Sequence, residues 1–364
     1  MSRRSGSFLV RHIQRTIGAV AIAAAFAAGA AYAQDTRPLA DYKPEARVSG
    51  AIRAWGSTHM AALMKRWEAG FRKYQPDVVF VDTLKGTASA QFALHTNVAD
   101  VALSGRELYP YEYYGIFRRS QLYPREFEVA TGSFDVRGKS TALGVFVHKD
   151  NPLAKLTLEQ LDGIFGAERS GGWNKIVWDE TVARTAADNI RTWDQLGLSG
   201  EWSGKPMHVY GPPGIHPGGV SFFQIRVLGG SDTRNDALVE FDDRQAMLDA
   251  LAKDRYGIAY APLAYRNDAV KAIALADRSA ASTDPKYVAP TRANVANRTY
   301  PLARSAYIYV APDTASGDRA PMDPKVREFL RYVLSRQGQA DVAREGDHLP
   351  LLPATARAQL KKLD

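Results

Sequence analysis

The stretch from Asp77 to Ala90 reads DVVFVDTLKGTASA, an apolar run followed by a polar turn and the start of a second apolar segment. The apolar and β-branched run is typical of a strand that is buried in a sheet. Gly86 to Ser89 supplies the turn, and its two hydroxyls directly precede a predicted helix. A strand that leads through a short turn into a helix is the repeating unit of α/β domains with largely parallel sheets.

Two flanking segments repeat this pattern. Ala51 to Trp55 (AIRAW) predicts a strand, and the turn Gly56-Ser57-Thr58 links it to a helix with an apolar stripe from Met60 to Tyr74. Ala99 to Gly105 (ADVALSG) predicts another strand, which ends in the turn Ser104-Gly105-Arg106. Further strands are predicted at 141–149, 257–263 and 305–312, and further helices after the capping residues Thr157, Asp243 and Asp323. We expect the polar residues 278–297 to form a surface excursion.

The N-terminus predicts export. Four arginines precede the apolar run from Ile17 to Ala31, which ends in the small-residue sequence Ala31-Tyr32-Ala33. This arrangement is typical of a secretory signal peptide that is cleaved after Ala33. No later apolar segment has the length of a membrane span, so we expect a periplasmic protein that is not embedded in a membrane. Residues 34–364 are sufficient for two domains of ordinary size.

Composition narrows the class of partner. The formal net charge of +8 falls to about +4 when the four arginines of the signal peptide are removed. No run of Lys or Arg exceeds two residues, so a nucleic-acid partner is not expected. The chain has no cysteine and therefore depends on its core rather than on disulfides. It also has no N-terminal cysteine for a lipid anchor, and we expect a monomer.

The polar turns follow the carboxyl ends of predicted strands, where ligands bind in open α/β sheets. Helix N-termini present unpaired N–H groups and a partial positive charge, so hydroxyls beside them favour an anion. The stretch GPPGIHPGGVSFF, from Gly211 to Phe223, contains a further turn of this kind at Gly218-Gly219-Val220-Ser221. Each of these hydroxyls could instead cap a helix or form a turn. Both interpretations remain open from the residues alone.

Eight stretches, in order and spacing, carry a resemblance to a known family. The chain from about Val48 to Pro353 resembles the phosphate-binding type of periplasmic solute-binding protein, the soluble receptor of phosphate ABC transporters. The stretches are AWGSTHM, GTASA, ADVALSGREL, LTLEQLDGIFG, GGVSFF, GIAYAPLAY, YPLARSAYIYV and FLRYVLSRQGQADVAREGDHLPL.

The resemblance implies a type II two-lobed fold, in which each lobe is a mostly parallel sheet flanked by helices and the ligand lies in the cleft between the lobes. It implies a first lobe at 34–150 that resumes at 264–364, a second lobe at 151–263, and a signal peptide at 1–33. It implies capture of phosphate, or of a related oxyanion or phosphorylated solute, for delivery to an ABC transporter permease. The ligand-binding residues it implies are Ser57, Thr58, Thr87, Ala88, Ser89, Ser104, Arg106, His216, Gly218, Gly219 and Ser221.

Four positions depart from the family's phosphate site. Gly105 stands where the family has an Asp that accepts a proton from hydrogen phosphate, and Arg106 lies beside it. Gly214-Ile215-His216 replaces the family's Arg-x-Asp, and Val220 replaces a Thr. The loss of the acidic acceptor predicts either poor rejection of sulfate or a larger phosphorylated ligand.

Two alternatives have less support. A binding protein of the same fold could serve a sensor or an outer-membrane uptake partner with a different ligand. A secreted enzyme is the other alternative, but Ser221 lacks the second glycine of a nucleophile elbow, and the carboxylates of Glu126 and Glu128 are expected to line a solvated face. The seven histidines lack metal-ligand spacing. We therefore predict no catalytic residue, no metal and no cofactor.

Overall fold

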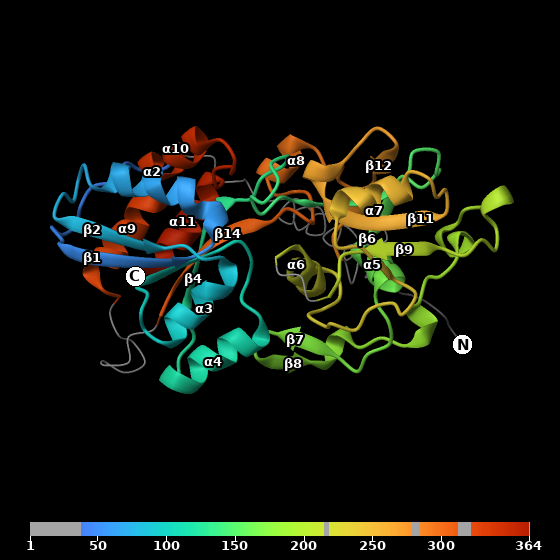
Figure 1. The fold of residues 1–364 in the computed structure, drawn as a ribbon, viewed down its shortest axis with the longest axis horizontal. Helices are drawn as coiled ribbons and strands as arrows, with labels where there is room; N and C mark the ends of the chain where they lie inside the picture. The colour runs from blue at the N-terminus through green and yellow to red at the C-terminus, as the bar shows by residue number, and fades with distance from the viewer. Residues whose placement is uncertain (1–37, 215–217, 279–283, 312–321, 364) are drawn as a thin grey trace, which may run out of the picture. The chain divides into compact units, whose positions relative to one another are not determined.

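Two five-stranded sheets organise the chain, and each carries helices on its faces (Figure 1). This computed structural model describes residues 38–214, 218–278, 284–311 and 322–363. The predicted signal peptide at 1–33 and the candidate ligand residue His216 lie outside the described residues. None of the described helices combines the length and the apolarity that a membrane crossing requires.

The first sheet has the strand order β2-β1-β3-β14-β4. Its strands are β1 (Gly50–Gly56), β2 (Val78–Thr83), β3 (Val101–Ser104), β4 (Arg125–Thr131) and β14 (Ser305–Val310). β1 pairs in parallel with β2 and β3, whereas β14 pairs antiparallel with β3 and β4. The sheet is therefore mixed, because β14 returns from a distant part of the chain and runs against its neighbours.

Helices cover both faces of this sheet, and we call the sheet together with these helices the first lobe. They are α2 (Ala61–Phe71), α3 (Thr87–His95), α4 (Pro110–Ser120), α9 (Pro324–Val333), α10 (Arg336–Glu345) and α11 (Pro353–Leu360). The predicted apolar stripe of α2 is buried, and its Trp67 Nε1 donates to the carbonyl of Gly338 in α10 at 3.0 Å. A Cβ on Gly70 of α2 would lie 1.8 Å from the Tyr332 hydroxyl, so only glycine allows α9 to approach there.

The second sheet has the order β10-β9-β11-β5-β12 and forms the second lobe. Its strands are β5 (Leu143–His148), β9 (His208–Gly211), β10 (Val239–Glu240), β11 (Gly257–Pro262) and β12 (Val270–Ala272). β9 pairs in parallel with β10 and β11, and β5 pairs antiparallel with β11 and β12. Phe223 of α6 (Gly219–Arg226) stacks on Tyr260 of β11 with ring centroids 3.9 Å apart, at the centre of this lobe's core.

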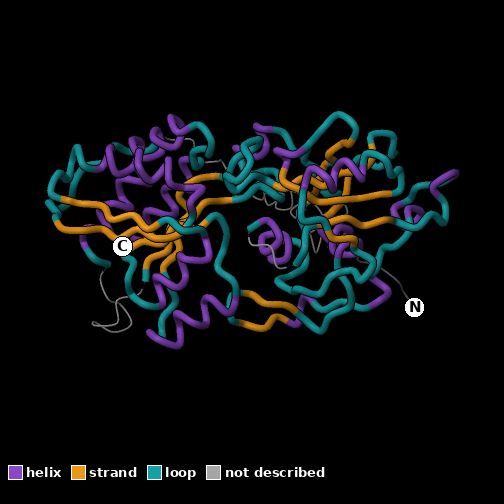
Figure 2. Tube along the Cα trace, in the orientation of Figure 1, coloured by secondary structure: helices purple, strands orange, loops and turns teal. Residues whose placement is uncertain are grey.

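Shorter elements complete the second lobe (Figure 2). The helices are α5 (Leu158–Phe165), α7 (Arg244–Leu251) and α8 (Arg292–Ala296). Two small sheets pair β6 (Lys155–Thr157) with β13 (Ala274–Ala276), and β7 (Gly172–Asn174) with β8 (Val177–Asp179). The three capping predictions are confirmed, since Thr157, Asp243 and Asp323 each begin a helix: α5, α7 and α9 respectively.

The chain passes between the sheets at positions that differ from the expected lobe boundaries. β5 belongs to the second sheet although it precedes Asp150, and β12 belongs to it although it follows Leu263. Part of the predicted surface excursion forms α8, whose Val295 packs in the second lobe's core. A buried apolar strand has the same sequence pattern in either sheet, so periodicity does not indicate which sheet it joins.

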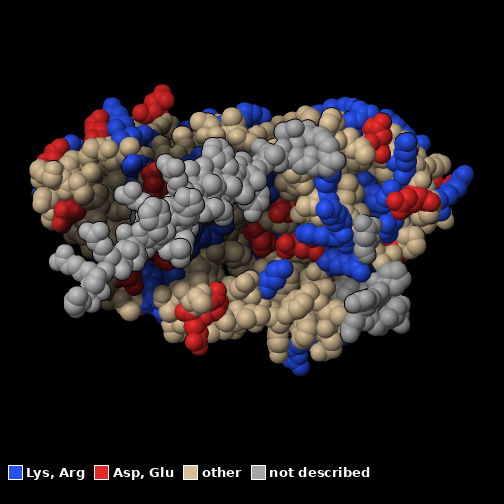
Figure 3. Space-filling model, turned by 180° about the vertical axis from the view of Figure 1, so that it is seen from behind, with Lys and Arg blue, Asp and Glu red and all other residues tan. Residues whose placement is uncertain are grey.

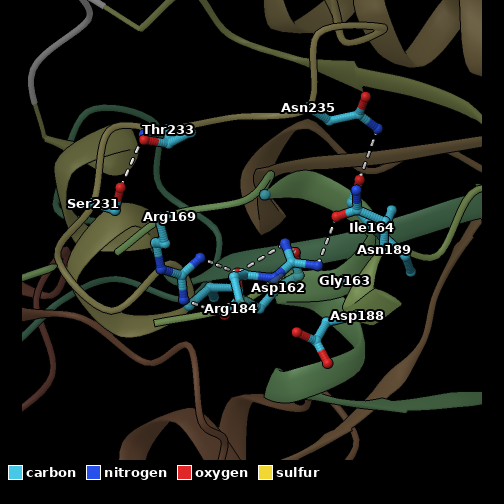
Figure 4. Close-up of polar contacts among 12 residues, drawn as sticks. Asp162, Gly163, Ile164, Arg169, Arg184, Asp188, Asn189, Ser231, Thr233 and Asn235 are labelled. Carbon is cyan, nitrogen blue, oxygen red and sulfur yellow. Dashed lines mark hydrogen bonds and ion pairs between the residues drawn. The ribbon is translucent and has the colours of Figure 1, made fainter. Parts of the chain in front are cut away.

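A buried carboxylate organises the irregular part of the second lobe (Figure 4). Asp162 of α5 accepts two hydrogen bonds from Arg169, at 2.7 and 2.6 Å, and lies 3.3 Å from Nη2 of Arg278. Arg184 donates to the backbone carbonyl of Asp162 at 2.7 Å. The side chains of Arg169, Arg184 and Asp162 are each at most 6% exposed. One carboxylate therefore joins segments from three separate parts of the chain.

Candidate functional site

A cavity of about 400 Å³ lies between the carboxyl-end turns of the first sheet and the helices of the second. The first lobe contributes Thr58, His59 and the turn from Gly86 to Ala88. The second lobe contributes Gly218, Gly219 and Val220 at the beginning of α6, together with Arg244 and Tyr260. Arg304 and the segment that contains Gly138, Ser140 and Thr141 complete its wall.

The turns of the first lobe meet because β1 lies between β2 and β3 in the sheet. The N–H of Ser57 donates to the carbonyl of Leu103 at 2.9 Å, and the N–H of Gly86 donates to the carbonyl of Gly56 at 2.9 Å. Gly56 has φ +123°, and a Cβ there would lie 2.1 Å from the carbonyl oxygen of Leu103. Only glycine fits this close approach of two strands. The predicted convergence of the polar turns at one edge of the sheet is therefore present.

Two helices begin at the cavity wall without a side-chain cap. α3 follows the N-cap residue Gly86 and α6 follows Gly218, and neither glycine has a side-chain oxygen that could accept from the N–H groups of the first turn. The first N–H groups of an α-helix have no partner within the helix and carry a partial positive charge. Since α3 belongs to the first lobe and α6 to the second, an anion in the cavity would receive N–H groups from both sides.

Arg304 brings a buried positive charge to the same cavity. It is 8% exposed, and its Nη2 donates to the carbonyl of Gly105 at 2.8 Å, the one hydrogen bond that its side chain makes to a described residue. No carboxylate among the described residues forms an ion pair with it. Burial lowers the pKa of Arg304 to about 10, since charge is costly away from water. A guanidinium has five N–H donors, so most of its hydrogen-bonding capacity remains for a ligand.

His59 adds a titratable group to the cavity wall. Partial desolvation of its ring lowers its pKa below the usual value although the residue is exposed, and the positive charges of Lys139, His348 and Arg304 lower it further. The ring lies close to the backbone of Gly138, where a Cβ would be 3.0 Å from its Cε1 and Nδ1 atoms. The imidazole is therefore held neutral near neutral pH in the absence of an anion.

Two segments connect the lobes: the first, residues 132–142, joins β4 to β5, and the second, residues 297–304, joins α8 to β14. They run side by side at this cavity. The N–H of Gly132 donates to the carbonyl of Arg304 at 2.8 Å, and the N–H of Leu143 donates to the carbonyl of Leu302 at 3.1 Å. Ser140 Oγ, on the first connection, donates to the carbonyl of Gly105 at 3.1 Å. The carbonyl oxygen of Gly105 thus accepts hydrogen bonds from side chains on both connections, those of Ser140 and Arg304. The candidate site is built partly from the segments about which the lobes would move.

The structure brings five of the predicted ligand residues to the cavity wall and leaves five others away from it. Those at the wall are Thr58, Thr87, Ala88, Gly218 and Gly219. Ser89 and Ser221 donate their hydroxyls to the carbonyls of Gly86 and Gly218, and Ser104 donates to the carbonyl of Arg106. Ser57 is fully buried, and its Oγ has no hydrogen-bond partner among the described residues.

Arg106 differs most from its expected role. Its Nη1 and Nη2 each donate to the Glu112 carboxylate at 2.7 Å, and the residue is 2% exposed. It lines a separate cavity and does not contribute to the wall of the first one. Two guanidiniums line the first cavity, those of Arg244 and Arg304, and the buried one is Arg304, for which the sequence predicts no role. Its sequence signal is a single cation between the buried Leu302 and the buried strand β14.

Neither a cluster of metal-binding side chains nor a charged surface of a single sign is found among the described residues at the site. The described part of the chain contains no group of three His, Cys, Asp or Glu residues that could hold a metal ion. None of the described residues that line the 400 Å³ cavity is an Asp or a Glu. Figure 3 shows Lys and Arg interspersed with Asp and Glu over the described part of the face opposite to that in Figure 1. The Lys and Arg residues of the described cavity wall are Arg244 and Arg304.

Comparison with known proteins supplies independent evidence. Residues 42–337 match the family model of the PBP superfamily domain. A phosphate-binding protein PstS from Pseudomonas aeruginosa is 30% identical over 344 residues, which cover 94% of this chain and 96% of that protein. An ABC-type phosphate transport receptor from Vibrio cholerae has a similar fold, with a TM-score of 0.50, 20% identity and coverage of 82% and 99%. PstS from Borrelia burgdorferi is similar at a TM-score of 0.51, 15% identity and coverage of 83% and 99%.

Proposed function

The chain belongs to the PBP superfamily and, within it, to the phosphate-binding-protein family, and from this membership we propose that it is an exported receptor for phosphate or a related oxyanion. The anion binds between the lobes and is delivered to the permease of an ABC transporter. The predicted signal peptide at 1–33 supports a periplasmic location. The chemistry is binding rather than catalysis.

One observation carries the proposal: Arg304, a buried guanidinium with no ion-pair partner among the described residues, lines a cavity that two helix N-termini also line. An unpaired buried cation is costly for the folded protein. An oxyanion removes this cost because it accepts a forked pair of N–H bonds from the guanidinium. The N–H groups of α3 and α6 and the hydroxyl of Thr87 supply further donors. The preferred ligand is therefore small, anionic and rich in hydrogen-bond acceptors.

Selection among anions follows from the composition of the wall. A carboxylate that faces the ligand would reject a fully ionised oxyanion, because neither group could supply the proton between two oxygens. The described wall contains no such carboxylate, in agreement with Gly105 at the family's Asp position. We therefore expect sulfate to bind with an affinity similar to that of phosphate.

Calorimetric titration of ligand-free protein with phosphate and with sulfate tests the proposal. Arg304→Gln should weaken the binding of both anions by about 1.5–3 kcal/mol, the usual contribution of a hydrogen bond to a charged group. Thr87→Ala should weaken binding in the same direction. Two matched variants serve as controls: Ser89→Ala, whose hydroxyl is already bonded to Gly86, and Arg255→Gln, whose exposed guanidinium pairs with Glu201.

The outcomes are distinct. Binding of neither phosphate nor sulfate to the ligand-free protein would reject the proposed function. Unchanged affinity in Arg304→Gln would retain an anion receptor but remove Arg304 from its site. Strong rejection of sulfate would show that an acidic acceptor outside the described wall faces the ligand.

A further inference from the structure

A second cavity, of about 910 Å³, adjoins the candidate anion site. Ala88, in the first turn of α3, lines both cavities. On one side the second cavity is lined by Tyr109, Tyr111 and Tyr114, at and within the beginning of α4. On the other side it is lined by Trp173 and Ile176 of the hairpin formed by β7 and β8. The space therefore extends from the anion site between an aromatic helix and an aromatic hairpin.

The aromatic side chains present open ring surfaces. Tyr111 is 65% exposed, Tyr114 is 52% exposed and Trp173 is 43% exposed. Tyr109 and Tyr111 are stacked, with centroids 5.3 Å apart and an interplanar angle of 13°. Large aromatic rings are rarely left in contact with water in such numbers unless they bind something. Flat rings that face a cavity are suited to stack on another flat ring.

A buried ion pair fixes the position of these rings. The guanidinium of Arg106 lies over the ring of Tyr109, 4.2 Å from its centroid, and forms two hydrogen bonds with Glu112. The backbone N–H of Tyr109 also donates to Glu112, at 2.7 Å. Because the pair is neutral overall and nearly inaccessible to water, it orients the aromatic wall without adding net charge to it.

Arg106 retains one unused donor at this cavity. Its Nε is buried and has no hydrogen-bond partner among the described residues. Gln224 and Asp232 of the second lobe add an amide and a carboxylate to the same cavity wall. The cavity is therefore mainly aromatic with a few polar groups, as is usual for binding sites of small organic molecules.

The hairpin of β7 and β8 lies beside α4 (Figure 1), and side-chain contacts between the lobes hold it there. The ammonium of Lys175, at the hairpin tip, lies 5.5 Å from the ring centroid of Tyr113 in α4. Ile176 packs against the apolar cluster that contains Tyr113 and Ile116. The hairpin thus forms the far wall of the cavity rather than extending into solvent.

We propose that this second cavity binds the organic group of a phosphate monoester, and that this group carries an aromatic ring. The inference rests on the proposed function, since the phosphoryl group would occupy the anion site at Arg304 and Thr87. From there the ester oxygen would lead past Ala88, and the ring would stack between Tyr111 and Trp173. An inorganic anion would leave the whole aromatic cavity unused.

Calorimetric titration with phenyl phosphate, ethyl phosphate and inorganic phosphate tests this inference. At about pH 8 both esters are dianions, since the second pKa of a phosphate monoester is about 6. They therefore differ mainly in the ring. We expect phenyl phosphate to bind about tenfold more tightly than ethyl phosphate, because burial and stacking of the ring add to the common anion contacts.

Variants assign the preference to the cavity. Tyr111→Ala and Trp173→Ala should each remove most of the preference for phenyl phosphate while they leave the affinity for inorganic phosphate within about twofold. Phe92→Ala removes a 65% exposed aromatic side chain of α3 that lines neither cavity, and should change nothing. Thermal unfolding of each variant, monitored by circular dichroism, verifies that it is folded.

Equal affinities for the two esters would overturn the inference, as would a ring preference that survives both substitutions. If inorganic phosphate binds in either of these cases, the proposed function stands and only the aromatic extension falls. If none of the three compounds binds, the proposed function fails and the inference fails with it.

Discussion

The protonation states of two single residues, Arg304 and His59, help to determine the positive charge in the cavity wall. Arg304 and His59 both line the wall, and both have a pKa below its usual value, because burial of Arg304 and partial desolvation of the exposed His59 disfavour their charged forms. The two groups differ in consequence. Arg304 remains protonated at any physiological pH, since its pKa of about 10 is still high, whereas His59 is neutral near neutral pH until an anion approaches. The guanidinium therefore supplies a permanent charge and the imidazole a conditional one.

The conditional charge predicts a pH dependence of affinity. An anion beside His59 favours the imidazolium, so the pKa of His59 is higher in the complex than in the free protein. Protons are then taken up on binding, and affinity rises as the pH falls from about 7.5 to about 5.5. Sulfate is the suitable probe because it stays fully ionised over this range, so any change reports on the protein.

Calorimetry with sulfate at several pH values, in the parent protein and in His59→Gln, measures this effect. We expect the pH dependence to be lost in His59→Gln, with the affinity at about pH 7.5 little changed. If the variant retains the full pH dependence, another titrating group accounts for it.

At the scale of helices and strands, most of the first lobe follows from the sequence. The predicted strands at 51–55, 77–84 and 99–105 coincide with β1, β2 and β3 to within two residues at each end. α4 and β4 were not predicted. α4 has four tyrosines or phenylalanines and a glycine, and its first turn is fixed by hydrogen bonds of Glu112 with Arg106 and with the backbone of Tyr109.

β4 shows why some elements are decided only by partners distant in sequence. Glu126 and Glu128 alternate along it, and their carboxylates were expected to line a solvated face. That expectation is wrong, since Glu126 accepts hydrogen bonds from Tyr113 and Tyr309 at 2.7 and 2.8 Å, and Glu128 pairs with Arg298. The partners come from α4, from β14 and from the segment before it, and no local pattern indicates them.

The cluster around Asp162 predicts the stability of the second lobe. Asp162→Asn would remove the negative charge beside the buried Arg169 and Arg184, and would replace one of the two oxygens that accept hydrogen bonds from Arg169. Removal of one partner from a buried ion pair usually costs about 3–5 kcal/mol, and we expect a loss of this size in the free energy of unfolding. Urea denaturation monitored by circular dichroism measures it.

A neighbouring carboxylate provides the control. Asp188 is exposed and caps a short helical turn through Thr185, so Asp188→Asn should cost about 1 kcal/mol or less. Similar losses for Asp162→Asn and Asp188→Asn would mean that the arginines find other acceptors when Asp162 is neutral, and that the cluster does not organise the lobe.

At the scale of the whole described chain, the sequence predicts the α/β fold and its family but not the chemistry of the site. The glycine and hydroxyl turns were found because they are local, and five of their residues line the cavity. Arg304 was not found because its significance depends on Gly105, about 200 residues earlier in the chain. Arg106 was expected to contact the ligand because it follows Gly105 in the polar turn. Its side chain instead pairs with Glu112, and this pair forms only when α4 is folded.

The position of the site at the two connections predicts that ligand binding and lobe movement are coupled. Arg304 lies on one connection, and Ser140, on the other, bonds to the same carbonyl of Gly105. An anion that draws Arg304 toward the N-termini of α3 and α6 therefore acts directly on the segments that join the lobes. Closure would also reduce the open volumes of about 400 and 910 Å³ that face both lobes.

Small-angle X-ray scattering of the mature protein, with and without saturating phosphate, should therefore show a smaller radius of gyration in the presence of ligand. Arg304→Gln at a phosphate concentration that saturates it should show a smaller change than the parent, because the guanidinium would no longer link the anion to the connection. The control Arg255→Gln keeps the site intact and should contract like the parent. Scattering that is identical with and without phosphate in all three proteins would mean that the lobes are fixed, held by contacts such as those of Lys175 and Ile176 with α4, and that phosphate enters a site already closed.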